Sequence, residues 1–272
     1  MERYIADSWS TLSELGLAKD SSPTRWRFTA DLEDAVAETD YVQESVPDLL
    51  SVKAPLYEQL DRCVAPEVII GSSTSSLRMT DLQRSMKTRA RTVVVHPFQP
   101  PHLIPCVEVV AGQFTAPETV QWTKNTFESL GKIVLLVKRE VTGHIVNRLQ
   151  AALFQEASWL VREGVADVAD VDRGIAFGPG LRWAIMGPFL TFHLAAHPGG
   201  IRQYLGSLGP SFERIWEDLG SLDGGFSPEL IERIGQGVDE QAAGASMDEL
   251  SRHRDAILVQ LVKAALIREA DR

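Results

Sequence analysis

Short apolar runs alternate with longer amphipathic stretches over the first half of the chain. The short runs predict strands, and the stretches with an apolar period near 3.6 residues predict helices. The strands predicted in this way are residues 26–28, 41–46, 68–70, 92–95, 106–110 and 133–137. The predicted helices are residues 7–19, 31–37, 49–64, 79–86 and 117–130. Alternation of this kind predicts a doubly wound α/β sheet of the Rossmann type.

The pattern becomes entirely helical in the second half of the chain. Residues 145–161 carry apolar side chains at helical spacing, and only helical patterns follow, broken by glycine and proline. Ser246 and Glu249 form a capping box that opens a final long helix. We therefore expect an incomplete Rossmann-like domain over residues 1–140 and an all-α domain over residues 141–272.

Composition and charge narrow the class of protein. The chain has 272 residues, of which 44% are hydrophobic and 24% charged, so a packed core is expected. A formal net charge of −10 disfavours nucleic acid and anionic membranes as partners. There is no apolar run long enough to span a bilayer and no apolar N-terminal signal segment, which favours a cytoplasmic protein. Cys63 and Cys106 form no spacing pattern, so we expect free thiols and no metal site.

Three polar residues stand in or just after apolar strands, where an open α/β sheet binds its ligands. Ser75 follows the strand at 68–70, His96 ends the next strand, and Glu108 lies within the strand after that. A histidine with a carboxylate behind it is a general base, since the carboxylate fixes the tautomer and stabilises the imidazolium. Taken singly, each residue also fits a purely structural role, as a loop hydroxyl, a structural histidine or a solvent-facing glutamate.

These residues lie in three of four sequence blocks, which cover residues 71–77, 96–100, 107–110 and 144–149. In order and spacing the blocks resemble the 3-hydroxyacyl-CoA dehydrogenase superfamily, and the resemblance covers about residues 25–265. It implies a 3-hydroxyacid dehydrogenase that uses NAD. His96 would be the base that takes the hydroxyl proton, Glu108 would pair with it, and Ser75 and Asn147 would hold the substrate oxygen.

The resemblance also implies contacts to the cofactor and to the substrate. Asp48 and Lys53, together with Ser75, match family positions that touch the nicotinamide cofactor. The segments that look most like the carnitine and gulonate dehydrogenases (lambda-crystallin), which act on free 3-hydroxyacids, are residues 43–47, 180–183 and 242–261. Arg182 would pair with a substrate carboxylate, because a guanidinium matches one bidentately. Trp183 would line the pocket, although a buried core tryptophan is an equal alternative.

The match fails at the nucleotide-binding end. The family begins with a strand, a G-x-G-x-x-G turn and a helix that bind the pyrophosphate, and the only early glycine here is Gly16. Met1 falls where the family is already past its second strand. We therefore expect a truncated Rossmann domain, weak or lost NAD binding, and an exposed edge on the strand at 41–46. Gln99 replaces a family asparagine, and Leu190 replaces a family glutamate.

Three hypotheses about function follow. The first is an NAD-dependent 3-hydroxyacid dehydrogenase in a truncated form, whose redox activity is reduced or lost; if the domain is instead remodelled, the protein does something else. The second is a non-redox enzyme that uses Ser75, His96 and Glu108 for proton transfer, dehydration or cyclisation. The third is a non-catalytic protein in the manner of a crystallin. In each case we expect a homodimer formed through the long helices at 145–161 and 250–265.

Overall fold

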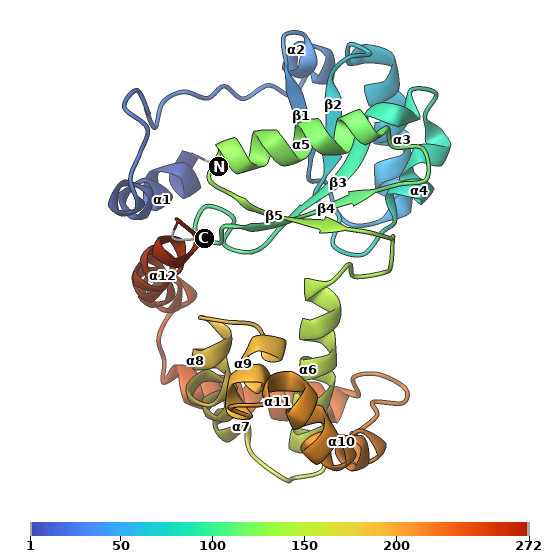
Figure 1. Cartoon of the computed structure of the whole chain (residues 1–272). Helices are drawn as coiled ribbons and strands as arrows, with labels where there is room; N and C mark the ends of the chain where they lie inside the picture. Colours follow the sequence, from blue (N-terminus) through green and yellow to red (C-terminus); the bar gives the residue numbers. More distant parts are fainter. Residues whose placement is uncertain (1, 271–272) are drawn as a thin grey trace. The chain divides into compact units, whose positions relative to one another are not determined.

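The computed structural model describes residues 2–270, with side chains described for residues 2–265. The chain divides into two compact units between Leu149 and Gln150 (Figure 1). Within the described residues, no helix has the length and apolar character needed to cross a membrane.

The first unit is built on a five-stranded sheet in the order β1-β2-β3-β4-β5. Its strands are β1 (Tyr41–Glu44), β2 (Ile69–Ser72), β3 (Thr92–Pro97), β4 (Cys106–Ala111) and β5 (Ile133–Val137). All neighbours are parallel except β3 and β4, which run antiparallel. A short connection without a helix joins β3 to β4, so the chain turns back on itself instead of crossing over the sheet. The expected Rossmann-like sheet is confirmed, with β4 and β5 running opposite to β1, β2 and β3.

Alternating side chains of the strands build two hydrophobic layers, one on each face of the sheet. Ile70, Val94 and Val110 face the layer formed with Tyr57 and Leu60 of α3 (Leu50–Cys63) and with α4 (Met79–Leu82). The opposite layer contains residues of α5 (Pro117–Ser129) packed on strand residues; its buried members are Ile69, Val93, Val95 and Val109. Figure 1 shows α5 on one side of the sheet and α3 and α4 on the other.

The N-terminal segment differs from the sequence-based prediction. The first helix is α1 (Glu2–Leu15), so the predicted range of 7–19 was wrong at both ends. Gly16 follows α1 with a φ of 103°, a conformation that glycine adopts readily, and no helix continues there. Residues 26–28 form no strand; Trp26 and Phe28 pack against each other instead. The short helix α2 (Leu32–Val36) forms as predicted, capped by the Asp31 side chain.

β1 is the edge strand of the sheet among the described residues, as expected for the strand at 41–46. Its Tyr41 side chain stacks on Trp122 and meets Phe127 edge-on, so α5 covers one face of this strand. The hydroxyl of Tyr41 occupies the space that a Cβ at Gly71 would need, which explains why glycine stands in the middle of β2. Among the described residues, β1 pairs with no strand other than β2, and an unpaired strand edge of this kind can pair with another chain.

The second unit is helical, as predicted. Its helices are α6 (Val146–Arg162), α7 (Val168–Phe177), α8 (Pro179–Trp183), α9 (Pro188–Ala195), α10 (Gly200–Asp218), α11 (Pro228–Ala242) and α12 (Met247–Ala270). Phe192 of α9 stacks on Tyr204 of α10, with a ring-centroid distance of 4.8 Å. The predicted capping box is present, since Glu249 Oε2 accepts from the backbone N–H of Ser246 at 2.8 Å and the Ser246 hydroxyl accepts from Glu249 N–H at 3.3 Å.

Candidate functional site

His96 and Glu108 form a buried pair at the end of β3. The two residues are direct partners in the antiparallel register of β3 and β4. Nδ1 of His96 lies 2.8 Å from Oε2 of Glu108, and both side chains are buried. Because a carboxylate only accepts, the Nδ1 that faces Glu108 carries a hydrogen, and in the neutral ring Nε2 is therefore the nitrogen that can accept a proton. The arrangement is therefore that of a general base whose tautomer is set by its partner.

The second oxygen of Glu108 holds the start of α6. Oε1 accepts hydrogen bonds from the backbone N–H groups of Ile145 at 2.8 Å and Val146 at 3.0 Å. Free amides at a helix start are a favourable place for a negative charge. Burial acts to raise the pKa of Glu108, but the bonds from His96 and from these amides outweigh it and hold the pKa below its ordinary value. Glu108 is therefore a carboxylate at neutral pH.

Ser75, in the loop after β2, and Asn147, in the first turn of α6, are joined by a hydrogen bond. Nδ2 of Asn147 donates to the backbone oxygen of Ser75 at 3.2 Å. The hydroxyl and the backbone N–H of Ser75 both donate to Oδ2 of Asp48, at 3.0 Å and 3.1 Å. The Ser75 oxygen can still accept a hydrogen bond from a ligand. These contacts fix Ser75 and Asn147 next to each other, and their contact with a substrate oxygen stays a prediction.

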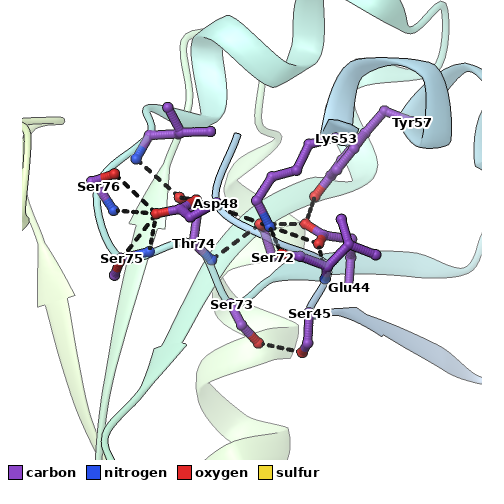
Figure 2. A network of polar contacts seen from close by, with 12 residues as sticks. Glu44, Ser45, Asp48, Lys53, Tyr57, Ser72, Ser73, Thr74, Ser75 and Ser76 are labelled. Carbon is purple, nitrogen blue, oxygen red and sulfur yellow. Dashed lines mark hydrogen bonds and ion pairs between the residues drawn. The ribbon is translucent and has the colours of Figure 1, made fainter. Parts of the chain in front are cut away.

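Asp48 organises the whole loop after β2, as Figure 2 shows. Besides Ser75, its carboxylate accepts from the hydroxyls of Thr74 and Ser76 and from the backbone N–H of Ser76. Burial acts to raise the pKa of Asp48, but these hydrogen bonds outweigh it and lower the pKa below its ordinary value of 3.8. In this structure, Asp48 holds the loop that carries Ser75; its predicted contact with a cofactor remains a prediction.

Lys53 is paired inside the protein with Glu44, the last residue of β1. Nζ of Lys53 lies 2.7 Å from Oε1 of Glu44, and each side chain is only 1% exposed. The ammonium also donates to the backbone oxygen of Val46 at 3.0 Å. The other carboxylate oxygen of Glu44 accepts from the hydroxyl of Ser72 at 2.7 Å (Figure 2). Such full pairing is what a buried ion pair requires. The predicted cofactor contact of Lys53 stays a prediction.

Two polar residues of this region had no role assigned from the sequence. Glu44 ends an edge strand, and a lone acid there reads as a solvent-facing side chain; its signal was its position at a strand end. His144 directly precedes α6 and is 2% exposed, with its ring 5.5 Å from that of His96. A histidine in a loop between two elements gives no periodic signal, so only the fold reveals that it reaches His96.

Arg182 and Trp183 lie on α8 in the second unit and are both exposed. The side chain of Trp183 is 40% exposed, so the alternative of a buried core tryptophan was wrong. Their predicted contacts with a substrate stay predictions.

The residues of the first unit fit a nicotinamide cofactor only in part. The strand ends supply polar groups near His96, where the reacting end of such a cofactor would lie. The pyrophosphate needs a glycine-rich turn between a strand and a helix. In residues 2–149 the loops that lead from β1 to α3 and from β2 to α4 contain no glycine. Gly112 follows β4, but a Cβ there would meet the side chain of Gln83, so this glycine serves internal packing.

The lowered pKa of Asp48 predicts a contribution to stability that depends on pH. The unfolded state takes up the proton first on acidification, so the contribution is present above pH 3.8 and is lost as the pH falls through the lower folded pKa. Asp48→Asn should lower the free energy of unfolding at neutral pH by about 1–3 kcal/mol. It should also flatten the pH dependence below about pH 4. Urea unfolding between pH 2.5 and 7 measures both effects.

Ser76→Ala is the matched control, because it removes only one hydroxyl donor to Asp48. The free energy of unfolding of Ser76→Ala, and the slope of that free energy against pH, should lie between the values of the wild type and of Asp48→Asn. If the free energy of unfolding of Asp48→Asn depends on pH as steeply as that of the wild type, the Asp48 carboxylate is not the source of the pH dependence.

Comparisons with known proteins assign both units to one family. Residues 1–141 match the model of the 3-hydroxyacyl-CoA dehydrogenase NAD binding domain, and residues 143–220 match that of the 3-hydroxyacyl-CoA dehydrogenase C-terminal domain. The L-carnitine dehydrogenase of Streptomyces coelicolor is 44% identical over 97% of the chain and 82% of its own length. That of Bacillus cereus is 39% identical over 97% of the chain and 80% of its own length.

Solved structures support the same assignment. The 5-formyl-3-hydroxy-2-methylpyridine 4-carboxylic acid 5-dehydrogenase, an NAD⁺-dependent dismutase, is 30% identical and has a TM-score of 0.80 over 97% of this chain and 85% of its own. The comparisons do not confirm the expected truncation or the expected loss of NAD binding. What they do show is plain: this chain belongs to the 3-hydroxyacyl-CoA dehydrogenase family.

Proposed function

We propose that the protein oxidises the 3-hydroxyl group of a free 3-hydroxyacid with NAD, and that L-carnitine is the first substrate to test. The observation that carries the proposal is the buried contact of 2.8 Å between His96 and Glu108. The similarity to L-carnitine dehydrogenases supports the substrate class. The NAD binding domain matched by residues 1–141 supports the cofactor.

Each residue of the site has a separate role in the proposed reaction. Nε2 of His96 takes the proton of the substrate hydroxyl, while Glu108 stabilises the imidazolium that forms. The substrate oxygen, which becomes the carbonyl oxygen, is held by Ser75 and Asn147. The chemistry that bound NAD would supply here is acceptance of the hydride from the substrate carbon. One C–H and one O–H bond break, one C=O bond forms, and the proton stays on His96 until solvent removes it.

We further propose that residues 1–140 bind the cofactor and that residues 141–272 supply substrate contacts. Arg182 would pair with the carboxylate of the 3-hydroxyacid and Trp183 would line its apolar part. A guanidinium suits this role because it binds a carboxylate through two parallel hydrogen bonds. Replacing Arg182 with glutamine should then raise KM for the acid more than it lowers kcat.

A non-redox enzyme is the second candidate. The observation that favours it is that residues 2–149 contain no glycine-rich turn at a strand end, while the Ser75, His96 and Glu108 arrangement is intact. Such a base could move a proton without a cofactor. Turnover of a 3-hydroxyacid in the absence of NAD would favour this candidate over the dehydrogenase.

The first prediction of the proposed function concerns the base. His96→Gln should lower kcat about 10²- to 10⁴-fold, because it removes the proton acceptor while keeping similar volume. Glu108→Gln should cost less, because His96 remains with weaker orientation. Steady-state kinetics with L-carnitine and NAD measure these losses, and calorimetric melting checks the fold.

Two controls accompany these variants. His102→Gln removes a histidine of the same unit that bonds to Tyr4, and Glu118→Gln alters an exposed glutamate at the start of α5. Both should retain wild-type turnover. A purely structural role of His96 would instead appear as a lower melting temperature with no specific loss of turnover.

The second prediction concerns the affinity for NAD. The protein should bind NADH only weakly, so that turnover needs a high concentration of the cofactor, because the described residues provide no glycine-rich cradle for the pyrophosphate. Fluorescence titration or calorimetry measures the dissociation constant. Micromolar binding would contradict the prediction and would point to a phosphate site of a different construction.

The third prediction concerns association. Helix α6 exposes large apolar side chains, including Phe154 at 55% exposure, and α12 exposes Leu250, Ile257 and Leu261. Exposed apolar faces of this kind favour a homodimer. Sedimentation at micromolar concentration should show a dimer, and Phe154→Glu should shift it toward monomer. Gln236→Glu adds a charge on exposed α11 and should leave the dimer intact. A monomeric wild-type chain would contradict the prediction.

A further inference from the structure

His144 is a buried titratable residue that the proposed reaction does not use. It lies between Gly143 and the start of α6, with a φ of 50°, and Gly143 has a φ of 77°. Two successive left-handed residues form a tight turn, a conformation that histidine adopts more readily than most residues do. This turn directs the histidine ring into the first unit, where it is 2% exposed.

The hydrogen bonds of the ring define its tautomer. Nε2 of His144 lies 3.2 Å from the backbone oxygen of Thr74. A carbonyl oxygen only accepts, so Nε2 carries the hydrogen and Nδ1 keeps a lone pair. Nδ1 is buried and has no hydrogen-bond partner within the described part of the chain. His144 thus donates to the residue that precedes Ser75.

A second proton on His144 would be unfavourable for two reasons. The new Nδ1–H group would be buried without an acceptor. It would also place a positive charge beside His96, whose ring centroid is 5.5 Å away. Burial is the largest cause that lowers the pKa of His144, and His96 acts in the same direction. The Thr74 oxygen and the charges of Glu108 and Asp48 act to raise that pKa but do not outweigh burial.

The backbone of the same turn supports the other half of the site. The residues that follow His144 are Ile145 and Val146, whose N–H groups bind Oε1 of Glu108. The side chain of His144 therefore contacts the loop that carries Ser75. The backbone amides that follow His144 contact Glu108, the partner of His96. A substitution at His144 would therefore affect both the loop that carries Ser75 and the carboxylate that orients His96.

We propose that His144 is a positioning residue of the His96–Glu108 site: its Nε2–H holds the backbone oxygen of Thr74, next to Ser75, and its turn presents two backbone amides to Glu108, the partner of His96. This inference rests on the proposed function for its kinetic consequence. The tautomer and the loop contact do not depend on the activity.

The first experiment observes the imidazole nitrogens of the full chain by ¹⁵N NMR, with assignment by His144→Asn. We expect His144 to show the neutral Nε2–H tautomer throughout the range of about pH 6–7 in which an exposed imidazole takes up its proton. In His144→Asn the amide signals of Ser75 and Ser76 should shift. A protonated or Nδ1–H form of His144, or unshifted loop amides, would overturn the inference even in an inactive protein.

The second experiment measures kinetics with L-carnitine and NAD. Asparagine suits the left-handed backbone but is too short to replace the ring, so His144→Asn should keep the melting temperature while lowering kcat about 10- to 100-fold with little change of KM. His144→Gln restores an N–H donor of similar reach and should recover most of the loss. The exposed His253 on α12 provides the control, and His253→Gln should retain wild-type kcat.

The two experiments separate failure of the inference from failure of the proposed function. Wild-type kcat in His144→Asn would overturn the positioning role while leaving the dehydrogenase assignment in place. Absence of any turnover by the wild type, together with the expected tautomer and loop shifts, would remove the proposed function and keep the structural role of His144.

Discussion

The site depends on one buried carboxylate, that of Glu108, which is 0% exposed. A charge in that position is tolerable only when every oxygen is paired, since an uncompensated buried charge costs several kcal/mol. Its partners are the ring of His96 on the neighbouring strand and the two amides that open α6. The hydrogen bonds that satisfy Glu108 therefore connect the sheet to the start of α6. The same carboxylate orients the ring of His96.

The reversed strand β4 makes that pairing possible. A parallel partner of β3 would need a crossover connection of a dozen or more residues. The antiparallel turn instead brings Glu108 directly opposite His96 after a short loop. The same reversal lets β4 pair in parallel with β5, so the sheet continues without interruption. The absence of a helix between β3 and β4 thus determines that Glu108 lies beside His96.

Much of this arrangement could be predicted from the sequence because polar residues interrupt apolar strands. Ser75, His96 and Glu108 stood out in this way, and the structure places His96 and Glu108 in contact. The strand predicted at 26–28 was wrong because aromatic residues favour strands only where a partner strand is available. Glu44 and His144 were not assigned roles because their importance lies in contacts between segments distant in sequence. Hydrophobic periodicity carries no signal for such contacts.

Proton transfer and cofactor binding are separable properties in this fold. The hydrogen bonds of His96, Glu108 and Ser75 with Asp48, Ile145 and Val146 join residues within the first unit. Asp48 and Glu44 supply that rigidity because each carboxylate is saturated with donors from the neighbouring loop or strand. A pyrophosphate site depends on a different feature, a glycine turn that exposes backbone amides at a helix start. Under the proposed function, the groups that would bind the dinucleotide therefore differ from the groups that would accelerate proton removal, and each set could change without the other.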